Sequence, residues 1–137
     1  MPYRTYTSID GIQIFVGKQS EDNDELSTNN KYRAKSEWWL HASGCPGSHV
    51  VVKCSDEAPP AQTIKDAAAL AARHSRFGRA KAVKVSLTRC RDVVKRAGAP
   101  PGQVELTGRV DVVAVDMRVA AERLARLDGT RGSSSTE

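Results

Sequence analysis

The residue types that could do chemistry gather in one stretch, residues 37–52, with the sequence EWWLHASGCPGSHVVV. It holds both tryptophans, two of the three histidines and one of the three cysteines. A bend rich in glycine separates two apolar runs, each of which predicts a short strand. Imidazole, thiol and hydroxyl groups bind metals, act as nucleophiles or donate hydrogen bonds to a ligand. Four interpretations of this stretch therefore compete.

The first two interpretations are a metal site and a hydrolase, and the spacing disfavours both. His41, Cys45 and His49 carry ligand atoms, with Cys54 as a candidate fourth, but zinc sites of the finger class use closely spaced ligand pairs. Ser48 and His49 are neighbours, and neighbouring side chains of a strand point to opposite faces. A Gly-x-Ser-x-Gly motif is absent from the sequence. The sequence therefore predicts a protein that is not an enzyme, with no metal and no cofactor.

The third interpretation is phosphate binding by the backbone, and the fourth is a purely structural turn. Gly44 and Gly47 allow main-chain N–H groups to approach an anion closely, and Ser48 and His49 add donors. In the structural alternative the glycines only form the turn. The two adjacent tryptophans are expected to face opposite sides of a strand. One ring should then be core and the other partly exposed, where it could stack on a base.

The composition is that of one globular domain. A chain of 137 residues is long enough for one core and short for two. No apolar run is long enough to cross a membrane, and we expect no cleaved secretory signal. An odd number of cysteines, three, without such a signal predicts reduced thiols and a cytoplasmic protein.

The charge is unevenly distributed along the chain. Residues 1–60 carry a net charge of −2 and residues 61–137 a net charge of +7, for a total of +5. A basic half favours a polyanionic partner, most often a nucleic acid. A solvated basic surface without a partner is the alternative.

The first half of the chain predicts strands joined by tight turns. An Asp-Gly pair between two β-branched and aromatic runs predicts a hairpin over residues 3–16. Ser20 is placed to cap a short acidic helix. The apolar runs 38–42 and 49–54 predict the strands on either side of the bend.

The second half predicts a long helix and three further strands. Thr63 is placed to cap a helix over residues 64–74, whose alanines would permit close packing on a sheet. Alternation predicts a half-buried strand over 83–88. Residues 104–107 and 110–115 are expected to pair as a hairpin.

These elements predict the fold class. Residues 117–127 have the amphipathic spacing of a C-terminal helix. We therefore expect a single α+β domain over residues 1–128, with a mostly antiparallel sheet of short hairpin-connected strands, one long central helix and a C-terminal helix. Residues 129–137, rich in glycine and serine, are predicted to be a disordered tail.

Four motifs in order resemble the NFACT-R domain, the RNA-binding module of ribosome-associated quality-control factors of the NEMF and RqcH type. They are DG…VGK…NDELS within residues 10–27, WLH…PGSHVV within 39–51, AAALAA…SR within 67–76 and T…VKRAGAPPGQV within 88–104. The resemblance covers residues 3–127.

The resemblance implies a non-catalytic RNA-binding module that acts in ribosome-associated quality control or translation. Its expected partner is tRNA or rRNA, with the large ribosomal subunit as a further candidate and no membrane. The other domains of the large factors do not fit in 137 residues, so the resemblance implies the binding module and not their whole activity. Binding of double-stranded DNA remains an alternative. A protein-interaction adaptor, docking through the acidic residues 21–25 and the C-terminal helix, is another.

The predicted contacts combine a basic surface with glycine bends and aromatic rings. Cations within residues 73–96 would contact phosphates, and the glycine bends would present backbone N–H groups. The expected nucleic-acid-binding residues are Lys18, Trp39, His41, Gly47, Ser48, His49, Arg73, Arg76, Arg79, Lys81, Lys84, Arg89, Arg91, Lys95, Arg96, Gly98 and Gly102.

Overall fold

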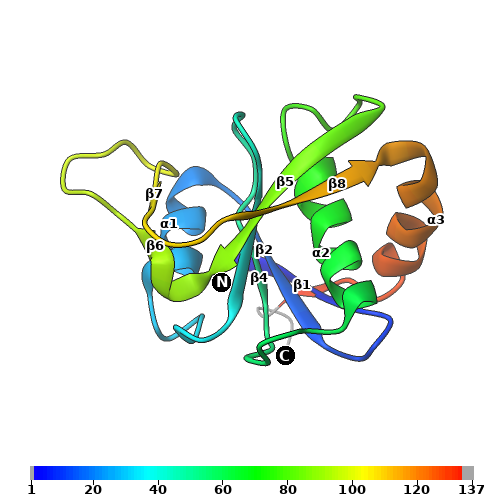
Figure 1. The fold of residues 1–137 in the computed structure, drawn as a ribbon, viewed down its shortest axis with the longest axis horizontal. Coiled ribbons are helices and arrows are strands. Elements are labelled where there is room, and N and C mark those ends of the chain that lie inside the picture. The colour runs from blue at the N-terminus through cyan, green and yellow to red at the C-terminus, as the bar shows by residue number, and fades with distance from the viewer. Residues whose placement is uncertain (1, 134–137) are drawn as a thin grey trace.

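A seven-stranded sheet runs through the middle of the computed structural model, which describes residues 2–133 (Figure 1). Its strand order is β8-β5-β3-β4-β2-β1-β9, and every pair of neighbours is antiparallel. These strands are β1 (Tyr3–Thr7), β2 (Gln13–Gly17), β3 (Trp38–Ala42), β4 (Val50–Val52), β5 (Ala82–Arg89), β8 (Asp111–Asp116) and β9 (Gly132–Ser133). A separate two-stranded ribbon pairs β6 (Val93–Val94) with β7 (Glu105–Leu106).

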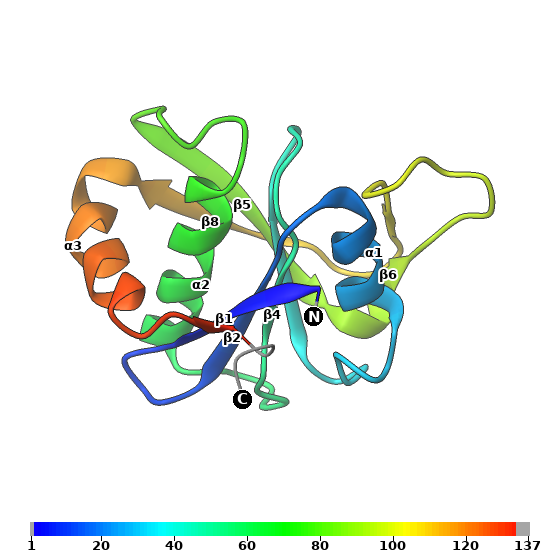
Figure 2. The same ribbon diagram turned by 180° about the vertical axis from the view of Figure 1, so that it is seen from behind.

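Helices cover both faces of the sheet (Figures 1 and 2). The helices are α1 (Ser20–Thr28), α2 (Ala61–Arg73) and α3 (Met117–Asp128), with a short 3-10 helix (Cys90–Asp92) after β5. The helices α2 and α3 pack on one face, and α1 with the β6–β7 ribbon lies on the other. The predicted α+β class with an antiparallel sheet, a long central helix and a C-terminal helix is confirmed.

Alternation along the strands divides the core between the two faces. Leu40, Val50 and Val52 face α2, where the six residues Ala67–Ala72 are all buried. The five alanines in this range let the helix axis approach the sheet, as the alanine pattern predicts. The tryptophan prediction is confirmed: Trp39 points to the α1 face and is 1% exposed, whereas its neighbour on the strand is only partly buried.

The helix starts differ from the predicted caps. The helix α1 begins at Ser20 itself, because Gln19 takes the cap position and forms a reciprocal capping box with Asp22. The helix α2 begins at Ala61, directly after a proline pair. The N–H groups of the first turn have no acceptor within a helix, so proline, which has no N–H, loses no hydrogen bond at this position. Thr63 is therefore not a cap. It is buried in the first turn, and its hydroxyl forms hydrogen bonds with the Ser8 hydroxyl and with the Asp10 carboxylate of the β1–β2 turn.

The hairpin predicted for residues 104–107 and 110–115 is wrong. The strand β7 pairs with β6, and β8 pairs with β5 over six residue pairs. Thr107 N–H donates to the Asp92 carbonyl at 2.9 Å, and the Thr88 hydroxyl donates to the Arg109 carbonyl at 2.8 Å. These bonds hold the two strands to different partners. Both partners lie earlier in the chain, so local sequence does not reveal the pairing.

The C-terminal segment adds a short edge strand. Gly132 and Ser133 pair with β1 beside Thr5 and Arg4. The predicted disordered tail therefore does not include these two residues, and residues 134–137 lie outside the described part of the chain. Within residues 2–133, none of the helices has the length and apolar character to cross a membrane.

Candidate nucleic-acid interface

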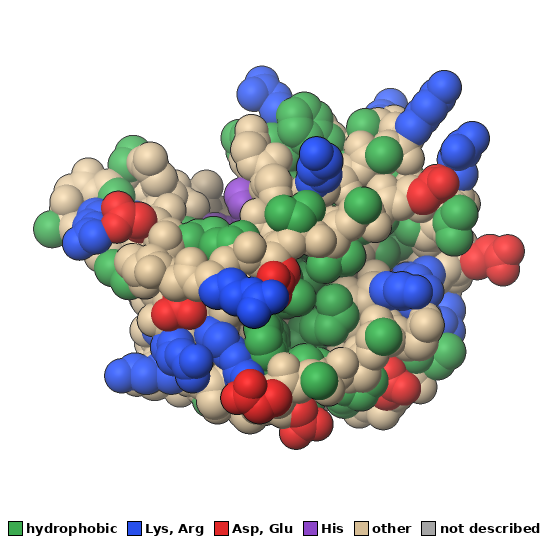
Figure 3. Space-filling view, in the orientation of Figure 1, with side chains coloured by type: hydrophobic (Ala, Val, Ile, Leu, Met, Phe, Trp, Pro, Cys, Tyr) green, Lys and Arg blue, Asp and Glu red, His purple; other side chains and the backbone are tan. Residues whose placement is uncertain are grey.

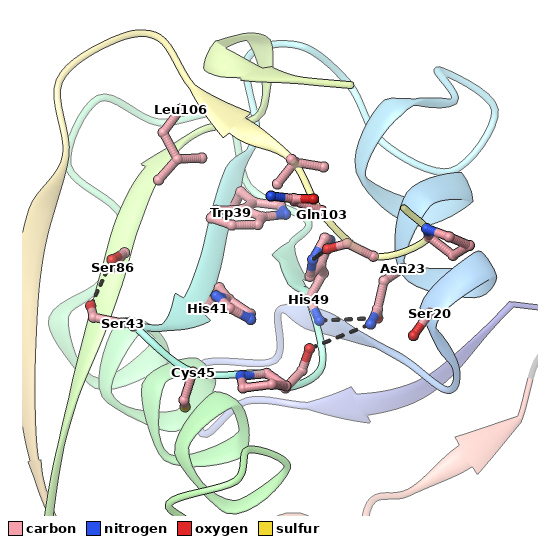
Figure 4. Close-up of a pocket in the computed structure, with 16 residues that line it drawn as sticks. Ser20, Asn23, Trp39, His41, Ser43, Cys45, His49, Ser86, Gln103 and Leu106 are labelled. Carbon is pink, nitrogen blue, oxygen red and sulfur yellow. Dashed lines mark hydrogen bonds between the residues drawn. The ribbon is translucent and has the colours of Figure 1, made fainter. Parts of the chain in front are cut away.

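A cleft of about 440 Å³ opens on the α1 face of the sheet. It lies between the β3–β4 bend (residues 43–49) and the β6–β7 loop (residues 95–104), and the space-filling view shows it as a hollow with histidine inside (Figure 3). Trp39, His41 and His49 line its base, and Gln103 from the loop lies beside Trp39 (Figure 4). The predicted bend residues thus line a real cavity, although its second wall comes from a segment about fifty residues later.

A hydrogen-bonded chain fixes the base of the cleft. Trp39 Nε1–H donates to Ser27 Oγ at 2.8 Å, and Ser27 Oγ lies 2.6 Å from His49 Nδ1. His49 Nε2 lies 3.1 Å from the Gly102 carbonyl. A carbonyl only accepts, so Nε2 carries the hydrogen and Nδ1 accepts from the serine hydroxyl. Every member is then satisfied with a neutral imidazole, and the hydrogen bonds join β3, α1, the β3–β4 bend and the β6–β7 loop.

The two histidines are uncharged near neutral pH. Burial, and then repulsion from the neighbouring His41 ring when that ring is protonated, lower the pKa of His49 to about 4. Burial also lowers the pKa of His41 from its ordinary value. No Lys, Arg, Asp or Glu lines the cleft among the described residues. The cleft is therefore polar but without net charge.

The bend is fastened to the end of α2. Ser48 N–H donates to the His74 carbonyl at 2.9 Å, and Arg76 N–H donates to the Pro46 carbonyl at 2.9 Å. Gly47 forms an isolated β-bridge with Ser75, and a β-carbon on Gly47 would lie 2.9 Å from Ser75 Cα. Only glycine permits this approach. The bend thereby holds the α2–β5 loop (residues 74–81) beside the cleft.

Replacing Gly47 with alanine should separate the bend from the α2–β5 loop. We expect a loss of about 1–3 kcal/mol in the free energy of unfolding, because a methyl group is forced against backbone. The amide NMR signals of Ser48 and Arg76 should shift. Gly44→Ala is the control: its β-carbon meets open space and only its φ of 73° opposes it. Unchanged signals and stability in Gly47→Ala would contradict the assigned role.

The predicted presentation of backbone N–H groups to phosphate is wrong for three residues. Ser48 N–H donates to the His74 carbonyl as described, and His49 N–H donates to Asn23 Oδ1 at 3.1 Å. Gly102 N–H donates to Asp24 Oδ1 at 3.1 Å. Two side chains of α1 and one backbone carbonyl thus occupy the donors that the glycine pattern suggested for a ligand. Gly98 is an exposed loop residue with a φ of 83°.

Several of the predicted cations are engaged within the protein. Arg73 forms two hydrogen bonds with the Asp128 carboxylate, at 2.9 and 2.7 Å. Lys95 Nζ lies 3.1 Å from Asp24 and also bonds two loop carbonyls. Arg96 pairs with Glu105. These side chains position α3 and the β6–β7 loop.

Arg89 does not lie on the surface where the sequence places it. The residue is 8% exposed, and its guanidinium lies 4.0 Å from the centroid of the Trp38 ring. It also donates to the Ser36 carbonyl. Because its side chain is buried, Arg89 is not available for the predicted phosphate contact.

Four of the predicted cations remain exposed and close together along one edge. Arg76, Arg79 and Lys81 lie on or beside the α2–β5 loop, and none has an ion-pair partner among residues 2–133. Lys84 lies on β5 with its side chain on the cleft side, because its neighbours Val83 and Val85 face α2 and α3. We call these four residues the basic edge; Lys and Arg side chains project along this border of the molecule in Figure 3.

Two other predicted cations lie outside the basic edge. Lys18 is exposed and follows β2, and Arg91 is exposed in the 3-10 helix. Sequence reasoning missed several cleft residues, namely Ser20, Asn23, Ser43, Ser86, Gln103, Val104 and Leu106. Ser86 lies opposite His41 in the sheet register, which no local pattern reveals.

Comparison with known proteins gives matches across most of the chain. Residues 1–108 match the family model described as the NFACT protein RNA binding domain. The chain is 42% identical over 100 residues to "Rqc2 homolog RqcH" of Bacillus subtilis (strain 168), covering 73% of this chain and 17% of that protein. It is 39% identical over 106 residues to the RqcH of Streptococcus suis (strain 05ZYH33), covering 76% and 18%. The chain thus spans less than a fifth of these relatives.

A solved structure extends the match past the region of the family model. The C-terminal part of the fibronectin/fibrinogen-binding protein from Streptococcus suis superposes with a TM-score of 0.82 at 30% identity, covering 93% of this chain and 49% of that one. The strand β8 and helix α3 follow residue 108, and the breadth of the superposition shows that they belong to the same fold. With the four motifs, the sandwiched sheet and these matches in agreement, the chain belongs to the NFACT-R family of RNA-binding domains.

Proposed function

We propose that this chain is a non-catalytic module that binds structured RNA, either tRNA or rRNA, in ribosome-associated quality control in the cytoplasm. Membership of an RNA-binding family and similarity to RqcH support the proposal. The observation that carries it is the basic edge beside an uncharged cleft. Cations that already pair with a carboxylate would have to break that pair to bind a phosphate, whereas those of the basic edge are available.

The proposed mechanism is electrostatic. Lys and Arg side chains that meet phosphates release condensed counterions, which supplies affinity without reading sequence. The bend orients the loop that carries most of the basic edge, because Ser48 and Arg76 bridge the two segments. Shape and the cleft, not the cations, would then select among RNAs.

Salt dependence tests the number of phosphate contacts. If the four residues of the basic edge each meet one phosphate, log affinity should fall with log salt with a slope between about −2.8 and −3.6. Fluorescence anisotropy of labelled tRNA, titrated at several salt concentrations from about 50 to 300 mM, measures this slope. An affinity that stays flat across the range would contradict the proposal.

Competition between nucleic acids separates the RNA proposal from DNA binding. Unlabelled tRNA should displace labelled tRNA at lower concentration than a DNA duplex of equal charge, when both are added at one salt concentration. Equal or better displacement by the duplex would make the DNA alternative the correct one. Recovery of a protein partner that survives RNase treatment, with no RNA binding, would favour the adaptor instead.

A further inference from the structure

We propose that the cleft binds one unpaired nucleotide of the RNA, with its base inside the cleft and its phosphates toward the basic edge. This inference rests on the proposed function and adds a second, selective contact to it. The base of a paired nucleotide is covered by its neighbours, so only an unpaired one can enter a cavity of this kind.

The walls of the cleft suit a planar, partly polar group. The Trp39 side chain is 1% exposed and supports the His41 ring from below, with ring centroids 5.7 Å apart. The His41 ring is half-buried and stands in the middle of the cleft, so it is the aromatic ring that a ligand can reach (Figure 4). Val104 and Leu106 add apolar surface on the far wall. Gln103 offers an amide with both a donor and an acceptor. Ring faces, apolar surface and amides are the groups that recognise unstacked bases.

The hydroxyl groups of Ser43, in the β3–β4 bend, and Ser86, on β5, leave hydrogen-bonding capacity for a ligand. Ser43 Oγ and Ser86 Oγ lie 2.7 Å apart, and one donates to the other. The second hydroxyl hydrogen then remains for a group that enters, since neither side chain has another partner among the described residues. His49, in contrast, uses both ring nitrogens within the protein and serves as a fixed wall.

The absence of charge decides which part of a nucleotide enters. No Lys, Arg, Asp or Glu of the described residues lines the cleft, and a phosphate placed there would lose its hydration without a counter-charge. A base or ribose loses far less. The cleft therefore takes the uncharged part of the nucleotide and leaves the phosphate outside.

The basic edge lies where that phosphate would be. Lys84 and Ser86 are two residues apart on β5 and share one face of the sheet, and Ser86 lines the cleft. Pro46 of the β3–β4 bend also lines the cleft, and its carbonyl accepts from Arg76 N–H at 2.9 Å. Lys84 on β5 and Arg76 on the α2–β5 loop thus border the cleft.

Three RNA hairpins test the inference; they share one stem, which a non-nucleotide linker closes so that no loop nucleotide is unpaired. The first is blunt, the second carries one unpaired 3′ nucleotide, and the third has an abasic nucleotide at that position. The unpaired nucleotide should tighten binding about tenfold, and the abasic one should not, because base contacts supply the gain. His41→Ala and Gln103→Ala should both remove the gain, and Gln103→Ala should leave the affinity for the blunt hairpin unchanged. Gln103 is exposed on a loop, so its replacement should not affect folding.

The outcomes separate this inference from the proposed function. Binding of the blunt and unpaired hairpins with equal affinity would overturn the cleft proposal and leave RNA binding by the basic edge intact. Loss of affinity for all three hairpins in Gln103→Ala would also overturn it, since the variant would then act on the phosphate contacts. No binding of any hairpin by the unaltered protein would overturn both.

Discussion

Replacing the whole basic edge, Arg76, Arg79, Lys81 and Lys84, with alanine should weaken tRNA binding at least about a hundredfold at near-physiological salt. Each lost contact forfeits the release of one counterion, so the salt slope should fall toward zero as well. The fold should survive, because all four side chains are exposed and none forms an ion pair within residues 2–133. Anisotropy titrations of both proteins, with thermal melts to verify folding, measure the effect.

The control removes the same amount of charge from outside the basic edge. Lys31, Lys35, Lys65 and Arg131 are exposed. The first two lie on the α1–β3 loop and Lys65 lies in the first turns of α2, which Figure 1 shows at the end away from the α2–β5 loop. Arg131 lies in the segment before β9. Their replacement should reduce affinity only slightly, through the general field of the protein. Equal losses in the two variants would show that net charge, and not the basic edge, attracts the RNA.

Replacing His49 with glutamine should lower stability at pH 7 and flatten its dependence on pH. Glutamine cannot satisfy both Ser27 and the Gly102 carbonyl in the same geometry, so we expect a loss of about 2–3 kcal/mol in the free energy of unfolding. Urea denaturation at pH 7 measures this loss. A variant as stable as the unaltered protein would contradict the importance of the hydrogen-bonded chain.

The pH dependence follows from the lowered pKa. His49 has a pKa of about 4 in the folded protein and about 6.5 when unfolded. Between these values the unfolded chain binds a proton that the folded protein does not, so stability falls as pH drops from about 6.5 to 4, by about 3 kcal/mol from this residue. His74 acts in the same direction, since burial and then Arg73 lower its pKa to about 4. Urea titrations at steps from pH 7 to 4.5 should show a shallower decline in His49→Gln, and an identical decline would contradict the assignment.

The local elements of this fold could be predicted from the sequence because short-range signals specify them. The Asp-Gly turn forms the β1–β2 hairpin, with Gly11 at a φ of 81°. The apolar runs beside the bend become β3 and β4, which pair directly. The pairing of β8 with β5 is different, because the strands are separated by the β6–β7 ribbon and only the tertiary fold brings them together.

The site was harder to predict than the fold, because a charged side chain is available to a ligand only if no other group of the protein already forms an ion pair with it. Arg73 and Arg76 look equivalent in the sequence, but Arg73 forms an ion pair with the carboxylate of Asp128. Likewise, the glycine bends suggest free N–H donors, and Asn23 of α1 takes one of them. Both partners are distant in sequence, so spacing alone could not distinguish structural cations and donors from those available for RNA.

Photochemical crosslinking of the protein to tRNA, with mass spectrometry of the crosslinked peptides, tests the central claim most directly. Contact through the basic edge and the cleft predicts crosslinks in residues 41–48, 74–84 and 98–104, which are separate in the sequence and adjacent in the fold. The basic-edge variant should lose them while the control variant keeps them. Crosslinks confined to the α1–β3 loop or to α3, or no crosslinked tRNA at all, would contradict it.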